Sequence, residues 1–248
     1  SCRIGALYVV GNYRAFSEAL HSTLVEARAA EDIAAQLVFA LNETLLDELH
    51  GRGEAAVERL EAQRAQLPKC GFGIYHGVHM VAVCIAACAS GRLAWGIGRL
   101  EEEWPRFVRS TVRHIPSIGT LVYYGRARLL VSAWVAGTLS TPAALRRVKH
   151  AVKAVARWPE YATFVAAQQA RLELAAGKRD AALEKLRAPM PLNVRPVDRE
   201  NARYLLTYLL GTDAGSAQCL GFEDELRSKG VDARAYLASL YPELFNGR

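Results

Sequence analysis

The chain has 248 residues, of which 51% are hydrophobic, and its formal net charge is +6. Five cysteines, an odd number without framework spacing, exclude a disulfide scaffold and indicate reduced thiols in the cytoplasm. The longest apolar run, residues 80–89, is about half the length that a bilayer requires, which excludes a membrane-spanning helix and predicts a buried one.

Apolar residues recur at helical spacing along nearly the whole chain, and no β-branched stretch alternates with a period of two. We therefore predict an all-α protein. The first helix expected after Gly11 ends near residue 30. The later helices are expected, in chain order, over residues 31–49, 53–67, 72–89, 93–108, 116–136, 143–156, 159–176, 180–186, 198–210, 216–229 and 232–240. Asp232 is the expected N-cap of the last helix.

Glycines punctuate these helices at almost regular intervals. They are Gly11, Gly53, Gly91, Gly137, Gly177 and Gly211. Neighbours lie about 34 to 46 residues apart, which is the period of helical-hairpin repeats. Because glycine ends a helix in the left-handed conformation without a side-chain penalty, each glycine is predicted to form the inner turn of one hairpin.

The pattern predicts an α-solenoid of antiparallel helical hairpins with a C-terminal helical cap. The repeats are expected over residues 1–188, a proline-rich linker over 189–197, and a cap packed on the array over 198–248. Residues 4–10 resemble the second half of a helix, so we expect the first hairpin to be truncated and the segment to come from a longer protein.

Two segments, 124–130 (YGRARLL) and 175–183 (AAGKRDAAL), together with the glycine turn and proline near the end of the chain, carry a family resemblance. The chain resembles the tetratricopeptide-like C-terminal region of bacterial, myxobacterial-type serine/threonine protein kinases and related signalling ATPases. Most repeats here exceed the roughly 34 residues of a tetratricopeptide unit. The resemblance implies a helical regulatory or scaffolding module, with the parent kinase domain among its partners.

Catalytic motifs are missing from the sequence. A kinase would need a glycine-rich strand loop, a β3 lysine and two aspartates, and no such set is found. Residues 71–77 (GFGIYHG) approach a phosphate loop, but the third glycine comes one residue late and no strand precedes it. His76 and His79 share a helix face near Cys70, but lack an interleaved carboxylate. We therefore predict no catalytic residue, cofactor or metal.

Two sets of residues are candidates for binding a partner. Arg146, Lys149, Lys153 and Arg157 form a basic stripe on one helix, opposite an apolar stripe. The stripe is either a dock for phosphate, RNA or an acidic partner, or the solvated face of an outer helix.

The second set lies on the long first helices of the pairs, which we assume to line the concave surface. Tyr75, Tyr123, Tyr124 and Trp134 either form a peptide groove there or fill the core between repeats. His79 is either a groove residue or a core histidine.

The function expected from these features is a non-catalytic regulatory or scaffolding module of a larger cytoplasmic signalling protein, which binds a protein or peptide on its concave face. Two alternatives remain. An all-α enzyme would show a closed polar pocket with perturbed carboxylates or histidines. A nucleic-acid or phosphate adaptor would bind through the basic stripe with strong salt dependence, although the scattered basic residues argue against it.

Overall fold

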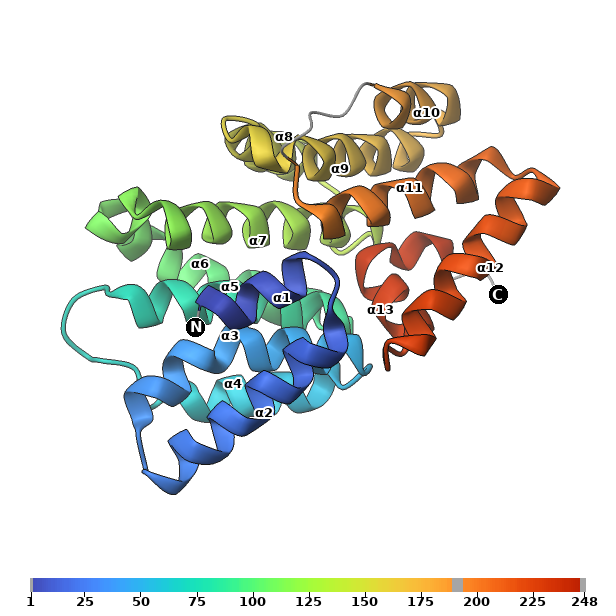
Figure 1. Cartoon of the computed structure of the whole chain (residues 1–248). Helices are drawn as coiled ribbons and strands as arrows, with labels where there is room; N and C mark the ends of the chain where they lie inside the picture. Colours follow the sequence, from blue (N-terminus) through green and yellow to red (C-terminus); the bar gives the residue numbers. More distant parts are fainter. Residues whose placement is uncertain (1, 189–193, 246–248) are drawn as a thin grey trace.

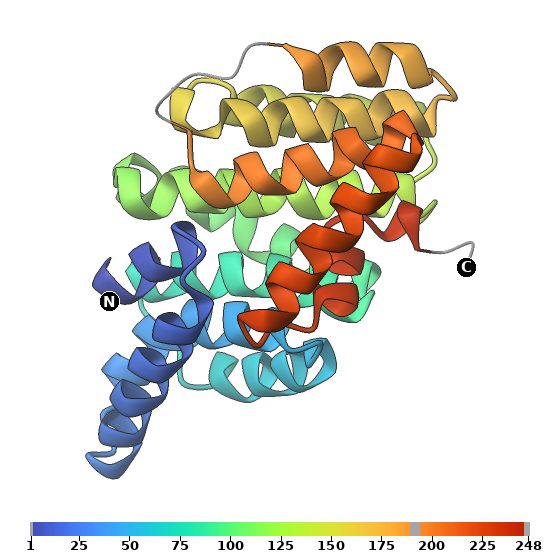
Figure 2. The same cartoon turned by 45° about the vertical axis from the view of Figure 1, so that its right-hand side comes forward.

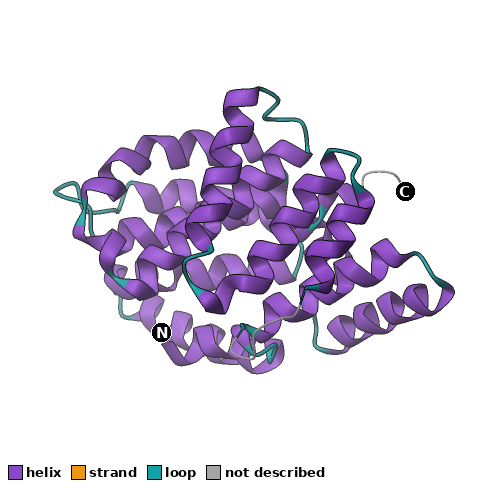
Figure 3. Ribbon diagram, turned by 90° about the horizontal axis from the view of Figure 1, so that it is seen from above, coloured by secondary structure: helices purple, strands orange, loops and turns teal. Residues whose placement is uncertain are grey.

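The computed structural model describes residues 2–188 and 194–245. Within them the chain is all-α, as predicted, with thirteen α-helices, three short 3-10 helices and no strand (Figure 3). The elements are α1 (Cys2–Val9), α2 (Tyr13–Ala29), α3 (Ile33–Leu49), α4 (Gly53–Arg64), α5 (Ile74–Ser90), α6 (Leu93–Arg109), η1 (Thr111–His114), α7 (Pro116–Val135), α8 (Pro142–Val155), η2 (Pro159–Tyr161), α9 (Ala162–Ala175), α10 (Arg179–Arg187), α11 (Pro196–Leu210), α12 (Asp213–Ser228), α13 (Ala233–Leu240) and η3 (Pro242–Leu244).

Consecutive helices pack in pairs: each odd-numbered helix up to α11 contacts the even-numbered helix that follows it. The odd-numbered helices also contact one another in succession, α3 on α5, α5 on α7, α7 on α9 and α9 on α11 (Figures 1 and 2). We call these five helices the inner layer. None of the helices that the structure describes is both long and apolar enough to cross a membrane.

Side-chain caps set the start of five helices. The side chains of the residues preceding α2, α3, α8, α12 and α13 each accept a hydrogen bond from a backbone N–H in the first turn; these residues are Asn12, Asp32, Thr141, Thr212 and Asp232. Such a bond satisfies one of the donors that a helix start leaves free. The predicted N-cap Asp232 is confirmed, with 3.0 Å from the Ala235 nitrogen to Oδ1.

Five of the six predicted turn glycines adopt the left-handed conformation, with φ between 62° at Gly211 and 78° at Gly11. The prediction for Gly53 is wrong. Gly51 takes the left-handed position, with φ of 68°, and Gly53 is the first residue of α4. A Cβ on Gly53 would lie 2.5 Å from the backbone of Ala89, so glycine is needed there for close packing of α4 on the end of α5.

The predicted linker falls partly outside the described residues, because residues 189–193 are not among them. Pro196, assigned to the linker from the sequence, is instead the first residue of α11. Its fixed φ suits the first helical position, where the missing N–H would have no partner.

The last helices return to the middle of the molecule. Helix α13 packs against α3, α5 and α12. The backbone N–H of Asp232 donates to the carbonyl of Leu49 at the end of α3, over 2.8 Å. One buried apolar cluster joins α1 and α2 to α11, α12 and α13, so the two ends of the chain share a core.

Candidate functional site

The C-terminal segment, residues 233–244 of α13 and η3, lies across the inner layer. It sits between α3 and α5 on one side and α7, α9 and α11 on the other (Figures 1 and 2). The contact with α11 is a hydrogen bond of 3.1 Å that the Asn201 amide donates to the Tyr236 hydroxyl. The segment thus touches all five helices of this layer.

A buried ion pair anchors α13. Arg128 of α7 pairs with Glu48 of α3, and their side chains are 3% and 0% exposed. Ser239 of α13 donates its hydroxyl to Glu48 Oε1 over 2.7 Å and receives Arg128 Nη2 over 3.1 Å. One residue of the C-terminal segment therefore completes a charged cluster that two inner helices supply.

A second ion pair anchors η3. Arg171 of α9 has no exposed surface. It makes a bidentate contact with Glu243, with Nε–Oε1 at 2.7 Å and Nη2–Oε2 at 3.1 Å. Gln168 Oε1 and Ser132 Oγ accept further hydrogen bonds from the same guanidinium, over 3.0 and 3.3 Å. Planar bidentate pairing of this kind is strong and directional.

A small polar cavity lies beside these anchors, under Leu240 and Tyr241 of the C-terminal segment. The inner layer contributes Tyr124, Arg128 and Asp198 to its wall. Burial raises the pKa of the Asp198 carboxyl above its ordinary value, against the opposing effects of the Arg195 guanidinium and the Tyr124 hydroxyl. The cavity contains a perturbed carboxylate, as the enzyme alternative requires. Its volume of about 20 Å³ suits one water molecule, so it has no room for a substrate.

Of the aromatic candidates, Tyr124 lines this cavity. Its ring centroid lies 4.1 Å from that of Phe164, and its hydroxyl donates to Asp198 Oδ1 over 3.4 Å. Tyr123 instead packs against Trp104 and Trp158, because successive residues of a helix point about 100° apart.

The remaining aromatic candidates do not line the cavity beside Asp198. Tyr75 is half-buried near the start of α5. The half-buried Trp134 lines an open pocket to which α7, α9 and the C-terminal residues Glu243 and Leu244 contribute. The structure therefore does not bring the predicted aromatic set together in one groove.

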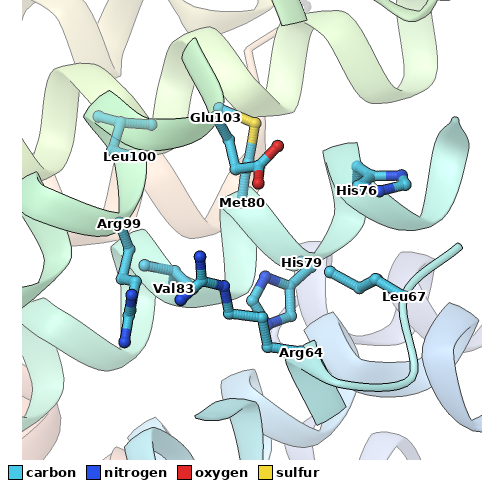
Figure 4. Close-up of a pocket in the computed structure, with 9 residues that line it drawn as sticks. All are labelled: Arg64, Leu67, His76, His79, Met80, Val83, Arg99, Leu100 and Glu103. Carbon is cyan, nitrogen blue, oxygen red and sulfur yellow. The ribbon is translucent and has the colours of Figure 1, made fainter. Parts of the chain in front are cut away.

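His79 lies in a pocket between α4, α5 and α6, with Arg64 beside it and Glu103 across the pocket (Figure 4). Its Nε2–H donates to the Leu60 carbonyl over 3.0 Å, and burial lowers its pKa. This arrangement is that of a buried histidine with a hydrogen-bond partner, and the pocket, about 10 Å³, is the size of one water.

His76 has a capping role. Its Nδ1 accepts the backbone N–H of Gly73 over 3.2 Å at the start of α5. Burial and the nearby Arg106 lower its pKa. Among residues 2–188 and 194–245, no three His, Cys, Asp or Glu side chains gather where they could hold a metal ion.

The basic stripe lies on α8, away from the C-terminal segment. Arg146, Lys149 and Lys153 are exposed. Arg157, just beyond the helix, stacks over Tyr123 and Trp158, with 5.0 and 4.7 Å from its Cζ to the ring centroids. The nine candidate binding residues thus fall into separate regions of the molecule.

Sequence reasoning missed the residues that hold the C-terminal segment: Glu48, Arg171, Ser239 and Glu243. A partial signal was present, since Glu48 and Arg171 lie in predicted helices with many apolar residues, although α3 also contains Glu43 and Asp47 and α9 also contains Glu173. Charges in such positions are rarely buried unless they are paired. The sequence did not identify the partners, which lie 191 and 72 residues away in the C-terminal segment.

No family model matches the sequence, and no match was found among curated proteins or solved structures. The candidate sites therefore rest on the geometry described above.

Proposed function

We propose that this chain is a non-catalytic protein-interaction module, an α-solenoid of helical hairpins whose inner layer binds a short helical segment. The C-terminal segment, residues 233–244, occupies that binding face within the same chain. The observation that supports this most directly is the position of the segment, which contacts α3, α5, α7, α9 and α11 together. Stacked hairpins generate extended concave surfaces of this kind.

The chemistry of the contact also supports the proposal. Charged and polar side chains, rather than apolar ones alone, hold the segment at Ser239 and Glu243. Buried ion pairs add little net stability over apolar side chains of similar volume, but removing one partner is costly. Such a contact favours a particular partner geometry, as expected for a surface that recognises a ligand.

The resemblance to C-terminal regions of bacterial serine/threonine kinases extends the proposal to the whole protein. The module would serve a cytoplasmic signalling protein, and its ligand would be a protein segment, with the parent kinase domain one source. Displacement of the C-terminal segment by that ligand would then couple binding to a change in the module.

The test is a peptide-exchange experiment on the complete chain. A protease site is introduced at the exposed turn around Gly230, and the chain is cut there after folding. A labelled peptide with residues 231–245 is then added. We expect the cut segment to stay bound and to exchange with the labelled peptide, so that anisotropy rises to saturation.

Two variant peptides make the test specific. Glu243→Lys removes the partner of Arg171 and is expected to weaken binding at least tenfold, about 1.4 kcal/mol. Arg234→Ala alters an exposed residue of α13 and is expected to leave binding unchanged. Failure of the labelled peptide to bind, or equal binding of both variants, would contradict the proposal.

A further inference from the structure

One part of the chain contains no acidic residues. Residues 104–159 contain ten Lys and Arg residues and no Asp or Glu, which leaves 21 basic residues and all 25 acidic residues to the rest of the chain. The net charge of +6 is therefore unevenly distributed: residues 104–159 are strongly positive, and the rest of the chain is mildly acidic. An uneven charge distribution of this kind steers and selects charged partners.

Within this segment, α8 presents charges that the protein itself does not neutralise. Some arginines elsewhere on the surface pair with carboxylates, as Arg64 does with Glu102, and Arg147 of α8 pairs with Glu101. Among the residues that the structure describes, no carboxylate lies within ion-pair distance of Arg146, Lys149 or Lys153. These side chains follow one another at three- and four-residue steps and so share one face of α8.

A groove lies beside this face, between α8, α9 and α10. Its volume is about 380 Å³. Val152, Ala156 and Leu172 give it an apolar part, and Lys149, Lys153 and Lys185 contribute charge from α8 and α10. The groove thus combines apolar contact area with ammonium groups from two helices.

We infer that the groove between α8, α9 and α10 binds an acidic, amphipathic segment of a partner protein. Carboxylates of that segment pair with Lys149, Lys153 and Arg146, and its apolar side chains contact Val152, Ala156 and Leu172. An amphipathic helix that places its apolar face in a groove is a recurrent mode of peptide recognition. This site shares helix α9 with the inner layer, but none of the residues that hold the C-terminal segment lines it, so it does not depend on the function proposed above.

The observations favour a protein segment over nucleic acid. Single-stranded nucleic acid is bound by aromatic side chains on which bases stack. The aromatic faces near α8 are already covered, since Arg126 lies 3.9 Å from the ring centroid of Trp104 and Arg157 covers Tyr123 and Trp158.

The test measures binding of a fluorescent helical peptide of Glu and Leu, about 18 residues or about 27 Å long, to the complete chain. We expect saturable binding at about 50 mM salt that weakens as salt screens the charges. A peptide with Gln in place of Glu is expected to bind at least tenfold more weakly. A labelled single-stranded oligouridylate and anionic phosphatidylserine vesicles are measured in parallel.

Three variants locate the site. Lys149→Glu with Lys153→Glu should weaken binding of the Glu–Leu peptide at least tenfold. The control, Arg14→Glu with Lys69→Glu, makes the same charge change at exposed positions outside α8 and should have little effect. Ala156→Leu fills the groove without changing charge and should weaken binding about tenfold, which attraction to the surface charge alone would not predict.

The inference would be overturned if the double Lys variant or Ala156→Leu bound the peptide as the unmodified protein does. Tighter binding of oligouridylate, in competition with the peptide and lost in the double Lys variant, would instead assign the face to nucleic acid. If the vesicles bind in preference to the peptide, and the double Lys variant loses this binding, the face of α8 would be assigned to a membrane surface. Circular dichroism of each variant checks that the fold is retained.

Discussion

The Arg171 guanidinium and the Glu243 carboxylate form a bidentate ion pair, with Nε–Oε1 at 2.7 Å, between α9 and the last turn of the described chain. Arg171 is fully buried, whereas the Glu243 side chain is 16% exposed. Because 72 residues separate the two, this contact fixes the C-terminal segment against a helix far away in the sequence. Mutation of Glu243 therefore tests how the segment is anchored.

Replacing Glu243 by Gln should lower the free energy of unfolding by about 3 kcal/mol, since it leaves a buried guanidinium without a counter-charge. The matched control is Glu200→Gln, which removes the same charge from an exposed pair with Arg203 and should cost less than about 1 kcal/mol. Urea unfolding of the two variants measures the difference. Equal effects would show that the buried pair does not anchor the segment.

The Glu48–Arg128 pair predicts strong coupling between two mutations. Arg128→Leu alone leaves the buried Glu48 carboxylate without its cation and should cost about 3 to 5 kcal/mol. Adding Glu48→Leu removes the unpaired charge, so the double variant should be more stable than Arg128→Leu alone. A thermodynamic cycle from urea unfolding measures the coupling, and additive effects would contradict the buried pair.

The sequence predicted the all-α fold and most helix positions because helical periodicity and glycine turns are local signals. It placed one turn glycine wrongly because Gly51 and Gly53 look alike in sequence, and only the packing of α4 against Ala89 distinguishes them. The location of the C-terminal segment could not be predicted either. It depends on pairs such as Glu48 with Ser239, which are distant in the chain.

The surroundings of the candidate binding residues could be predicted in part. The exposure of the basic stripe on α8 could be predicted, because the three- and four-residue spacing of its members places them on one helix face. Tyr123 and Tyr124 were grouped as neighbours in sequence, yet they contact different helices. His79 could not be assigned from sequence, because its partner is the Leu60 carbonyl, a backbone group without a sequence signature.

The packing of Gly53 predicts opposite effects for two similar mutations. Gly53→Ala would place a methyl group 2.5 Å from the Ala89 backbone and should destabilise the protein by about 1 to 3 kcal/mol. Gly98→Ala, at an exposed position inside α6 with no neighbour within 4 Å of the added carbon, should stabilise it by about 0.5 to 1 kcal/mol. Thermal unfolding should therefore shift in opposite directions; a neutral Gly53→Ala would contradict the close approach.

His79 predicts a pH dependence of stability. Because burial lowers its pKa in the folded state, the unfolded chain binds a proton that the folded chain does not as pH falls below about 6.5. Stability should therefore fall on acidification from about pH 7.5 to about 5.5. His79→Gln, which can still donate to the Leu60 carbonyl, should reduce that loss by about 1 kcal/mol.

The control for His79 is His21→Gln, at an exposed position on α2, which should retain the pH dependence of the unmodified protein. Burial also lowers the pKa of His50 and His76, so some loss on acidification should remain in the His79 variant. Identical pH profiles for His79→Gln and His21→Gln would contradict the role assigned to burial of His79.

The central claim is that the C-terminal segment is a displaceable occupant of the inner layer, and amide hydrogen exchange of the intact chain tests it most directly. If the claim is correct, the amides of α13 exchange through a local opening whose free energy is several kcal/mol below that of α5 and α7. Glu243→Gln raises the free energy of the folded state, so it should speed exchange in both α13 and α5 while the difference between them remains. If α13 instead exchanges only with global unfolding, at the same free energy as α5, the segment is an integral part of the core and the claim is wrong.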